Sequence, residues 1–409
     1  MKLAFRPVRR TPEEIRVPHG FAFATAIAGI KPSGRPDLTL AEVGQGATTA
    51  AAVFTKNRVA AAPVEVGRAN LKSSKGRIRA VLINSGNANC ATGPGGKTAC
   101  ELVCKEVARA LGLRAKEVFP SSTGIIGVPL PTQKIVAKLP ELLAARSSSE
   151  ASARAFANAI LTTDTRSKVA SVQIKIAGQL ITILGMAKGS GMIHPKMATM
   201  LAYIFTDIAA SAADLQRLLR TTTDSTFNCI SVDGDTSTND TVLLIASGKS
   251  GAKLNPATRP KFSQALQSVC ASLSEQIVSD GEGATHIIHL DIEQARDREE
   301  ALQIARAISH SPLVKTAWAG ADPNWGRILA AIGNSGVPVD PARIKIHIGD
   351  QEVCRNGAFH PFDEQRAHAH LSQSDCSIRV QLNRGKTNIQ FLTTDLTTEY
   401  VHINADYST

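Results

Sequence analysis

Strand-like and helix-like segments form separate groups along this chain of 409 residues, and this grouping limits the possible fold more than any other feature. Two apolar runs at 170–176 and 179–184 are separated only by Ala177-Gly178, a spacing typical of a hairpin turn between antiparallel strands. A doubly wound parallel sheet would instead need strands and helices in strict alternation. The pattern therefore favours an α+β fold built from packed layers.

The first half of the chain contains a strand, a polar loop and a helix in direct succession. Residues 79–84 have the apolar centre Ala80-Val81-Leu82-Ile83 of a buried strand, and residues 97–111 carry apolar side chains at helical spacing, with Gly112 as a stop. Apolar residues at helical spacing predict the remaining helices, and short alternating or continuous apolar runs predict the remaining strands. The expected helices are 133–145, 149–161, 211–224, 257–278 and 298–309, and the expected strands are 241–246, 285–292, 344–348, 377–382, 388–393 and 399–404.

The chain is basic, with 46 Lys and Arg residues against 35 Asp and Glu and a formal net charge of +11. Such an excess could indicate a nucleic-acid partner, an anionic substrate or only a basic surface. The basic residues are scattered, with no run longer than Arg9-Arg10, and an aromatic content of 4% leaves few platforms on which bases could stack. We therefore expect no nucleic-acid partner.

Seven cysteines form no CxxC pair and no regular framework, which indicates buried free thiols rather than disulfides or metal ligands. This usage fits a reducing compartment. The N-terminal segment lacks the apolar core of a signal peptide, and no stretch approaches the length of a membrane span. We expect a cytoplasmic protein with no membrane contact and no metal site.

Three loops have some features of ligand-binding loops but lack their defining patterns. The glycine-rich segments 189–191 and 280–285 lack both the GxxxxGK[ST] pattern and a strand-GxGxxG-helix context. We expect tight turns there, where the backbone passes close to another segment. Residues 233–240 place oxygen side chains at alternate positions, but the glycine and glutamate of a calcium loop are missing from their required places. A turn rich in hydrogen bonds from side chain to backbone is the simpler interpretation.

Serine nucleophile elbows and kinase signatures are absent, which leaves a threonine chemistry to consider. A threonine hydroxyl is a poor nucleophile without an adjacent base, but a threonine that becomes the first residue of a chain can use its own α-amine. The glycine-rich stretch 185–191 leads into 192–201, which contains Thr199. From spacing alone, Thr199 is better explained as a capped turn residue.

A series of short motifs runs in order from about Val17 to Thr409. It includes Asn84–Asn89, Ser122–Gly127, Thr162–Thr165, Ala187–Ile193, Met197–Met200, Asp233–Asp240, Gly281–Thr285, Asp322–Arg327 and Ile403–Tyr407. In these motifs the chain resembles the ornithine acetyltransferase family, also called bifunctional glutamate N-acetyltransferases. The resemblance implies a layered α/β sandwich of the N-terminal-nucleophile-like (DmpA/ornithine acetyltransferase) type.

The resemblance also implies a self-cleaving precursor. The bond between Ala198 and Thr199 would break, giving chains 1–198 and 199–409 that remain in one interwoven unit, with two copies of each chain in the assembly. Thr199 would then carry acetyl from N-acetylornithine to glutamate in a ping-pong cycle of arginine biosynthesis. No cofactor is implied, although acetyl-CoA is possible as a further acetyl donor.

The family's site residues carry over by motif. Thr199 would be the nucleophile, and Thr123 with Gly124 would form the oxyanion hole. The implied substrate contacts are Thr162, Lys188, Thr199, Glu282, Asn404 and Thr409. From charge, we expect Lys188 to meet the substrate α-carboxylate and Glu282 to meet the ornithine ammonium. For the segment 322–327, a structural turn and a role in supporting the site remain equally open.

Two other functions remain open at this point. An N-terminal-nucleophile-like aminopeptidase or amidase would pass the acyl group to water instead of glutamate. A non-catalytic binder of anionic metabolites is suggested only by the charge of +11.

Overall fold

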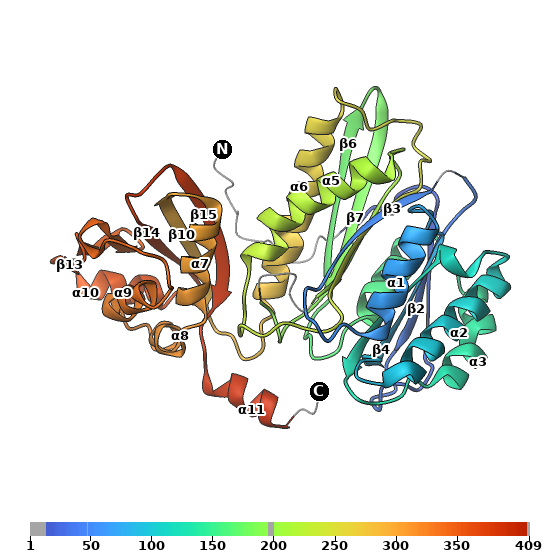
Figure 1. Ribbon diagram of the computed structural model, residues 1–409, viewed down its shortest axis with the longest axis horizontal. Coiled ribbons are helices and arrows are strands. Elements are labelled where there is room, and N and C mark those ends of the chain that lie inside the picture. The colour runs from blue at the N-terminus through green and yellow to red at the C-terminus, as the bar shows by residue number, and fades with distance from the viewer. Residues whose placement is uncertain (1–13, 47, 195–199, 407–409) are drawn as a thin grey trace.

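The structure is a computed structural model that describes residues 14–46, 48–194 and 200–406. Within these ranges the strands form three sheets (Figure 1). The first, in spatial order, contains β1 (Phe21–Ala26), β2 (Leu38–Val43), β4 (Ala80–Asn87) and β5 (Val118–Ile125). The second contains β3 (Thr49–Phe54), β9 (Thr241–Ala246), β8 (Leu201–Thr206), β7 (Gln179–Lys188) and β6 (Lys168–Ile176). The third contains β13 (Ala358–Phe359), β12 (Gln351–Arg355), β11 (Lys345–Ile348), β14 (Asp375–Gln381), β10 (Ile287–Ala295) and β15 (Thr387–Thr394).

The described ranges also contain helices, most of which cover the outer faces of the sheets. They are α1 (Ala62–Ser73), α2 (Gly93–Leu111), α3 (Thr132–Ala144), α4 (Glu150–Ala159), α5 (Ala212–Ser225), α6 (Arg259–Val278), α7 (Arg298–Ser309), α8 (Pro312–Ala319), α9 (Trp325–Gly333), α10 (Glu364–Leu371) and α11 (Thr398–Asp406). In Figure 1, α5 and α6 lie on one side of the sheet that contains β3, β6 and β7, and α1, α2 and α3 lie on the far side of the sheet that contains β2 and β4.

The first two sheets face each other because their strands are apolar on both faces. In β8, Tyr203 and Phe205 belong to the core between the sheets, whereas Ala202 and Ile204 belong to the core under α5 and α6. This alternation follows from the two-residue period of a strand. Phe205 meets Phe23 of the facing sheet edge to face, with 5.1 Å between ring centroids. The resulting order of helices, sheet, sheet and helices confirms the predicted α+β class and its layered sandwich.

The third sheet forms a separate C-terminal lobe with its own core. Apolar residues of β10, β11 and β14 pack there against α7, α8 and α9. In this sheet β10 lies parallel to β14 and antiparallel to β15. The lobe is seen at the left of Figure 1.

Local turn chemistry places several elements where the sequence predicts them. Ile176 pairs with Gln179 across the hairpin of β6 and β7, and Ala177 and Gly178 between them have φ angles of 47° and 83°. Positive φ at both positions is what a type I′ hairpin turn requires. Gly112 ends α2 in the left-handed conformation, with φ of 65°. These two predictions are confirmed.

The strand predicted at 399–404 is wrong, because this segment is part of helix α11. Alternating Val401 and Ile403 suggested a strand, but the segment joins no sheet and has no buried residue. The hydroxyl of Thr397 accepts a hydrogen bond from the Tyr400 amide, as a helix N-cap does, and donates one to the Gly283 carbonyl. This local capping selects the helix.

Two further findings concern the described residues only. None of their helices is long and apolar enough to cross a membrane. All seven cysteines lie in the described ranges, and each is a buried free thiol, as predicted.

Candidate functional site

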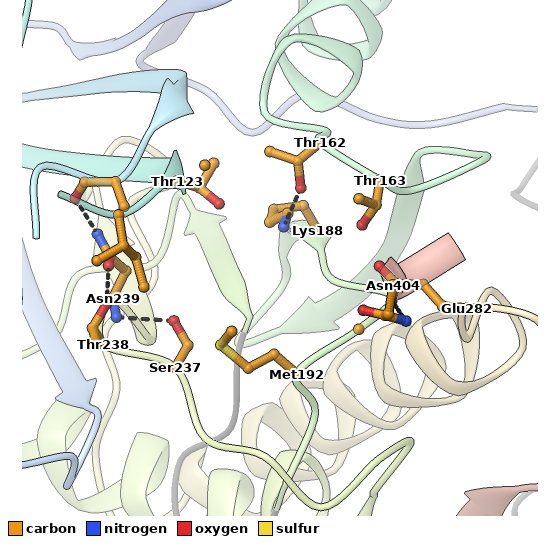
Figure 2. A pocket seen from close by; sticks show the side chains of 14 residues that line it. Thr123, Thr162, Thr163, Lys188, Met192, Ser237, Thr238, Asn239, Glu282 and Asn404 are labelled. Carbon is orange, nitrogen blue, oxygen red and sulfur yellow. Dashed lines mark hydrogen bonds between the residues drawn. The ribbon is translucent and has the colours of Figure 1, made fainter. Parts of the chain in front are cut away.

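Residues from distant parts of the chain line one pocket near the ends of β5 and β7 (Figure 2). Six of the predicted site residues take part in it. They are Thr123 and Gly124 of β5, Thr162 in the loop after α4, Lys188 at the end of β7, Glu282 in the loop after α6, and Asn404 of α11. Ala198, Thr199 and Thr409 lie outside the described residues.

Strand pairing brings this part of the sequence to one end of the five-stranded sheet. Lys188 is the last residue of β7 and pairs with Leu201, the first residue of β8. Leu201 in turn pairs with Thr241, the first residue of β9. The loops that precede β8 and β9 therefore reach the sheet at the same end as Lys188, where β7 ends and β8 and β9 begin.

One wall of the pocket carries a positive charge. The Lys188 ammonium is largely buried and donates a hydrogen bond of 2.7 Å to the Thr162 hydroxyl. It also lies 3.8 Å from a carboxylate oxygen of Asp164, which accepts a hydrogen bond from the buried Lys168 ammonium as well. Burial alone would raise the pKa of Asp164, but Lys188 and Lys168 together hold it well below its usual range. The ionised Asp164 keeps Lys188 in place as a cation.

Another wall carries a negative charge. The Glu282 carboxylate accepts a hydrogen bond of 3.0 Å from the Asn404 side chain, and Figure 2 shows these two side chains next to each other. Gly191 faces the same carboxylate, and any β-carbon at Gly191 would overlap it. A β-carbon at Gly283 would likewise overlap the Tyr400 backbone. The expectation that both glycine-rich segments pass close to another part of the chain is confirmed.

The wall formed by Thr123 and Gly124 depends on close contact between β4 and β5. Gly124 has a φ of 131°, and a β-carbon there would overlap the Gly86 carbonyl carbon and lie 2.5 Å from the Asn87 amide nitrogen. Only glycine fits this position.

The sequence did not single out all of the lining residues. Ser237, Thr238 and Asn239, in the loop before β9, also line the pocket, together with Ala88, Ile126, Thr163, Gly191 and Met192. The sequence signals for the three loop residues were the run of short polar side chains at 233–240 and the place of this run among the family motifs, neither of which assigned them to the site. That run is a turn stabilised by its own side chains, as predicted, because the Asn239 amide donates to the Ser237 hydroxyl and the Asp235 amide donates to Asp233.

Asp233 supports the part of the wall that contains Met192. Its carboxylate accepts hydrogen bonds from the amides of Met192 and Ile193. Met192 has a φ of 58°, which is uncommon for a residue other than glycine. Burial raises the pKa of Asp233 to about 6, although these backbone hydrogen bonds oppose the shift.

Asp233→Asn should change how the stability of the protein depends on pH. An acid whose pKa is raised by folding destabilises the native state once it ionises. This cost is absent below pH ~4, grows between pH ~4 and the folded pKa near 6, and is constant above. The Asn variant lacks this cost. The difference in unfolding free energy between variant and parent should therefore shift in favour of the variant by up to roughly 3 kcal/mol between pH 4 and pH 7. Urea titrations at both pH values measure this shift, and parallel pH curves for the two proteins would contradict it.

The segment 322–327 has contacts that favour a structural turn. The Asn324 side chain caps α9 by accepting a hydrogen bond from the Arg327 amide. The Arg327 guanidinium donates to the Leu313 carbonyl, which ties the start of α9 to α8. These residues belong to the C-terminal lobe, and the pocket lining described above does not include them.

The pocket thus combines a cation, a carboxylate and a glycine-containing strand end. Separate walls for opposite charges suit a ligand that carries both a carboxylate and an ammonium group.

A family model and curated relatives match this protein along nearly the whole chain. The model of the ArgJ family matches residues 22–409. The chain is 45% identical over 395 residues to the arginine biosynthesis bifunctional protein ArgJ of Methylococcus capsulatus, a match that covers 95% of each chain. It is also 45% identical to the protein of the same name from Thermus thermophilus, over 97% of this chain and 100% of the relative. Among solved structures, it is similar to the arginine biosynthesis bifunctional protein ArgJ of Bacillus halodurans, with 42% identity and a TM-score of 0.48, over 50% of this chain and 98% of that chain.

Proposed function

The chain belongs to the ArgJ family, and on that premise we propose that it is a glutamate N-acetyltransferase that moves acetyl from N2-acetyl-L-ornithine to L-glutamate. Its relatives are named as bifunctional proteins of arginine biosynthesis. The observation that carries the proposal is the gathering of Thr123, Gly124, Lys188 and Glu282 around one pocket. N2-acetyl-L-ornithine carries an α-carboxylate and a side-chain ammonium, and this pair of opposite charges complements Lys188 and Glu282.

The proposed reaction has two transfer steps. The Thr199 hydroxyl attacks the acetyl carbonyl of N-acetylornithine and gives its proton to its own α-amine, which then protonates the leaving amine. Ornithine departs and leaves an acetyl ester on Thr199. The amine of glutamate attacks this ester and gives a proton to the α-amine of Thr199. The bond between the Thr199 oxygen and the acetyl carbon then breaks, the proton passes to that oxygen, and N-acetylglutamate leaves with the Thr199 hydroxyl restored. In both steps Thr123 and Gly124 donate hydrogen bonds to the negative charge that develops on the acetyl oxygen.

The free α-amine requires that the chain first break its own Ala198–Thr199 bond. The fold is compatible with a cut at that position, because β3, β6 and β7 precede it and β8 and β9 follow it within one sheet. Chains 1–198 and 199–409 would remain joined by the pairing of β7 with β8 and of β3 with β9. We further propose an assembly with two copies of each chain, located in the cytoplasm.

Substrate orientation follows from charge. Lys188 offers its ammonium to the α-carboxylate that ornithine and glutamate share. Glu282 offers its carboxylate to the side-chain ammonium of ornithine, and Asn404 holds Glu282 by the hydrogen bond described above. The Thr162 hydroxyl accepts a hydrogen bond from the Lys188 ammonium and so fixes the direction of the Lys188 side chain.

An acyl-transfer assay on the purified protein tests the proposal. With N-acetylornithine as donor, we expect N-acetylglutamate to form faster than free acetate when glutamate is present, and ornithine to accumulate in step with it. A parallel reaction with acetyl-CoA as donor determines whether the enzyme has a second activity. Acetate release that glutamate does not change would instead identify an amidase, and absence of any turnover would contradict an enzymatic role.

A further inference from the structure

Asn239 connects three segments of chain at the pocket. Its side chain is 6% exposed, and its amide nitrogen Nδ2 donates hydrogen bonds of 2.7 Å to the Ala88 carbonyl and 2.9 Å to the Ser122 carbonyl. Its Oδ1 accepts a hydrogen bond of 2.6 Å from the Thr238 hydroxyl. Since both protons of Nδ2 and the oxygen are used, the side chain has one satisfied orientation. Figure 2 shows it on the same side of the pocket as Thr123.

The Ser122 carbonyl belongs to the peptide group that also contains the Thr123 amide. A trans peptide group is planar, so its carbonyl and its N–H point in opposite directions, and the described chain contains no cis peptide. A hydrogen bond that fixes the Ser122 carbonyl therefore also fixes the direction of the Thr123 N–H. The orientation of the backbone at Thr123 and Gly124 is thereby fixed.

Further hydrogen bonds make this arrangement rigid. The Ser122 hydroxyl donates to the Asn84 side chain at 2.6 Å, and the Asn84 amide donates to the Asn87 carbonyl at 2.8 Å. Asn239 and Thr238 come from beyond residue 199, whereas the carbonyl partners of Asn239, Ala88 and Ser122, come from the first half of the chain.

We infer that Asn239 is a positioning residue that aligns the hydrogen-bond donors of Thr123 and Gly124 with the acyl oxygen. The inference rests on the proposed function, because it assigns Thr123 and Gly124 to the oxyanion hole. It adds that the alignment of this hole depends on a side chain from the other proposed chain. Asn239 acts through the Ser122–Thr123 peptide, and the buried network holds that peptide before substrate arrives.

Asn239→Ala and Asn239→Asp test the inference. Loss of one oxyanion donor costs about 100- to 1,000-fold in kcat, and misalignment of a donor should cost part of that. We expect kcat per cut chain to fall roughly 10- to 100-fold, with KM changed less than about threefold, because the contact matters mainly in the transition state. The Asp variant has nearly the size of Asn but lacks both N–H donors and places a carboxyl group against two carbonyl oxygens. The Ala variant adds no such repulsion, so a fall in kcat in both variants identifies the loss of the hydrogen bonds as the cause.

Asn70→Ala provides a matched control. The Asn70 side chain also donates to two main-chain carbonyls, those of Ala115 and Val118, at the opposite end of β5. It should lower the melting temperature to a similar extent but leave kcat unchanged. A parental kcat in either Asn239 variant, or an equal fall in kcat in Asn70→Ala, would overturn the inference. If the parent releases acetate instead of acetylating glutamate, the proposed function fails, and the same comparison made on acetate release still tests Asn239.

Discussion

Thr199→Ala is expected to yield a folded, uncut chain that transfers no acetyl. The substitution removes the hydroxyl that would first attack the Ala198 carbonyl and later carry acetyl. Because both proposed steps use this hydroxyl, turnover should fall by several orders of magnitude. On a denaturing gel the parent should give two bands of nearly equal mass, one of which starts at Thr199 by N-terminal sequencing. The variant should give one band of full length.

A matched control separates this effect from general damage. Thr221 lies on α5, where its hydroxyl donates only to the Arg217 carbonyl, four residues earlier in the same helix. Thr221→Ala should therefore cut and turn over like the parent. An intact Thr199→Ala chain that transfers acetyl at the parental rate would refute the nucleophile and the mechanism built on it.

Gly124→Ala is expected to be the most damaging small substitution at the pocket. The added methyl overlaps the Gly86 carbonyl carbon, and the backbone there has a φ that other residues rarely adopt. Strain in φ costs roughly 1–2 kcal/mol, and overpacking against backbone adds roughly 1–3 kcal/mol. Strand β5 must then move away from β4, which displaces the proposed oxyanion donors. We expect kcat to fall more than about 100-fold in addition to the loss of stability.

Gly127→Ala serves as the control for Gly124→Ala. Gly127 also has positive φ, 84°, but a β-carbon there meets nothing within 4 Å. It should show only the conformational cost, roughly 1–2 kcal/mol by urea titration, with kcat near the parental value. Similar losses in both variants would show that backbone strain, and not the contact with β4, determines the effect at Gly124.

Elements with strong local signals could be predicted from the sequence. The Ala177-Gly178 hairpin and the Gly112 helix stop depend on backbone conformations that neighbouring residues determine. The strands β1, β2 and β3 were not predicted. These strands are only six residues long, and β3 consists largely of alanine, so it gives a weak local pattern. β3 pairs with β9, Thr49 against Ala246, from a distant part of the chain. Helix α11 was predicted as a strand because the alternation of Val401 and Ile403 is visible in the sequence. The hydrogen bonds of Thr397 that cap the helix are visible only in the structure.

In the pocket, too, residues that belong to recognisable sequence motifs could be predicted, whereas contacts between distant segments could not. Motif resemblance named Lys188, Glu282 and Asn404, and the structure brings them around one pocket. Asn239 was visible only as one polar residue of the motif Asp233–Asp240, with no role of its own. Its importance comes from two carbonyls that are distant in sequence, and no local pattern reveals which carbonyls a side chain will meet.

The strand order of the five-stranded sheet limits the sequence of events in the life of this protein. β9 and β8 are placed between β3 on one side and β7 on the other. Separately made pieces ending and starting at the proposed cut would each present unpaired strand edges, which readily aggregate. If the proposed cut occurs, folding would therefore precede it, and a gene split at codon 199 should produce inclusion bodies where the intact gene produces enzyme. Once cut, the two chains would separate on melting and would not refold together, so heat inactivation should be irreversible.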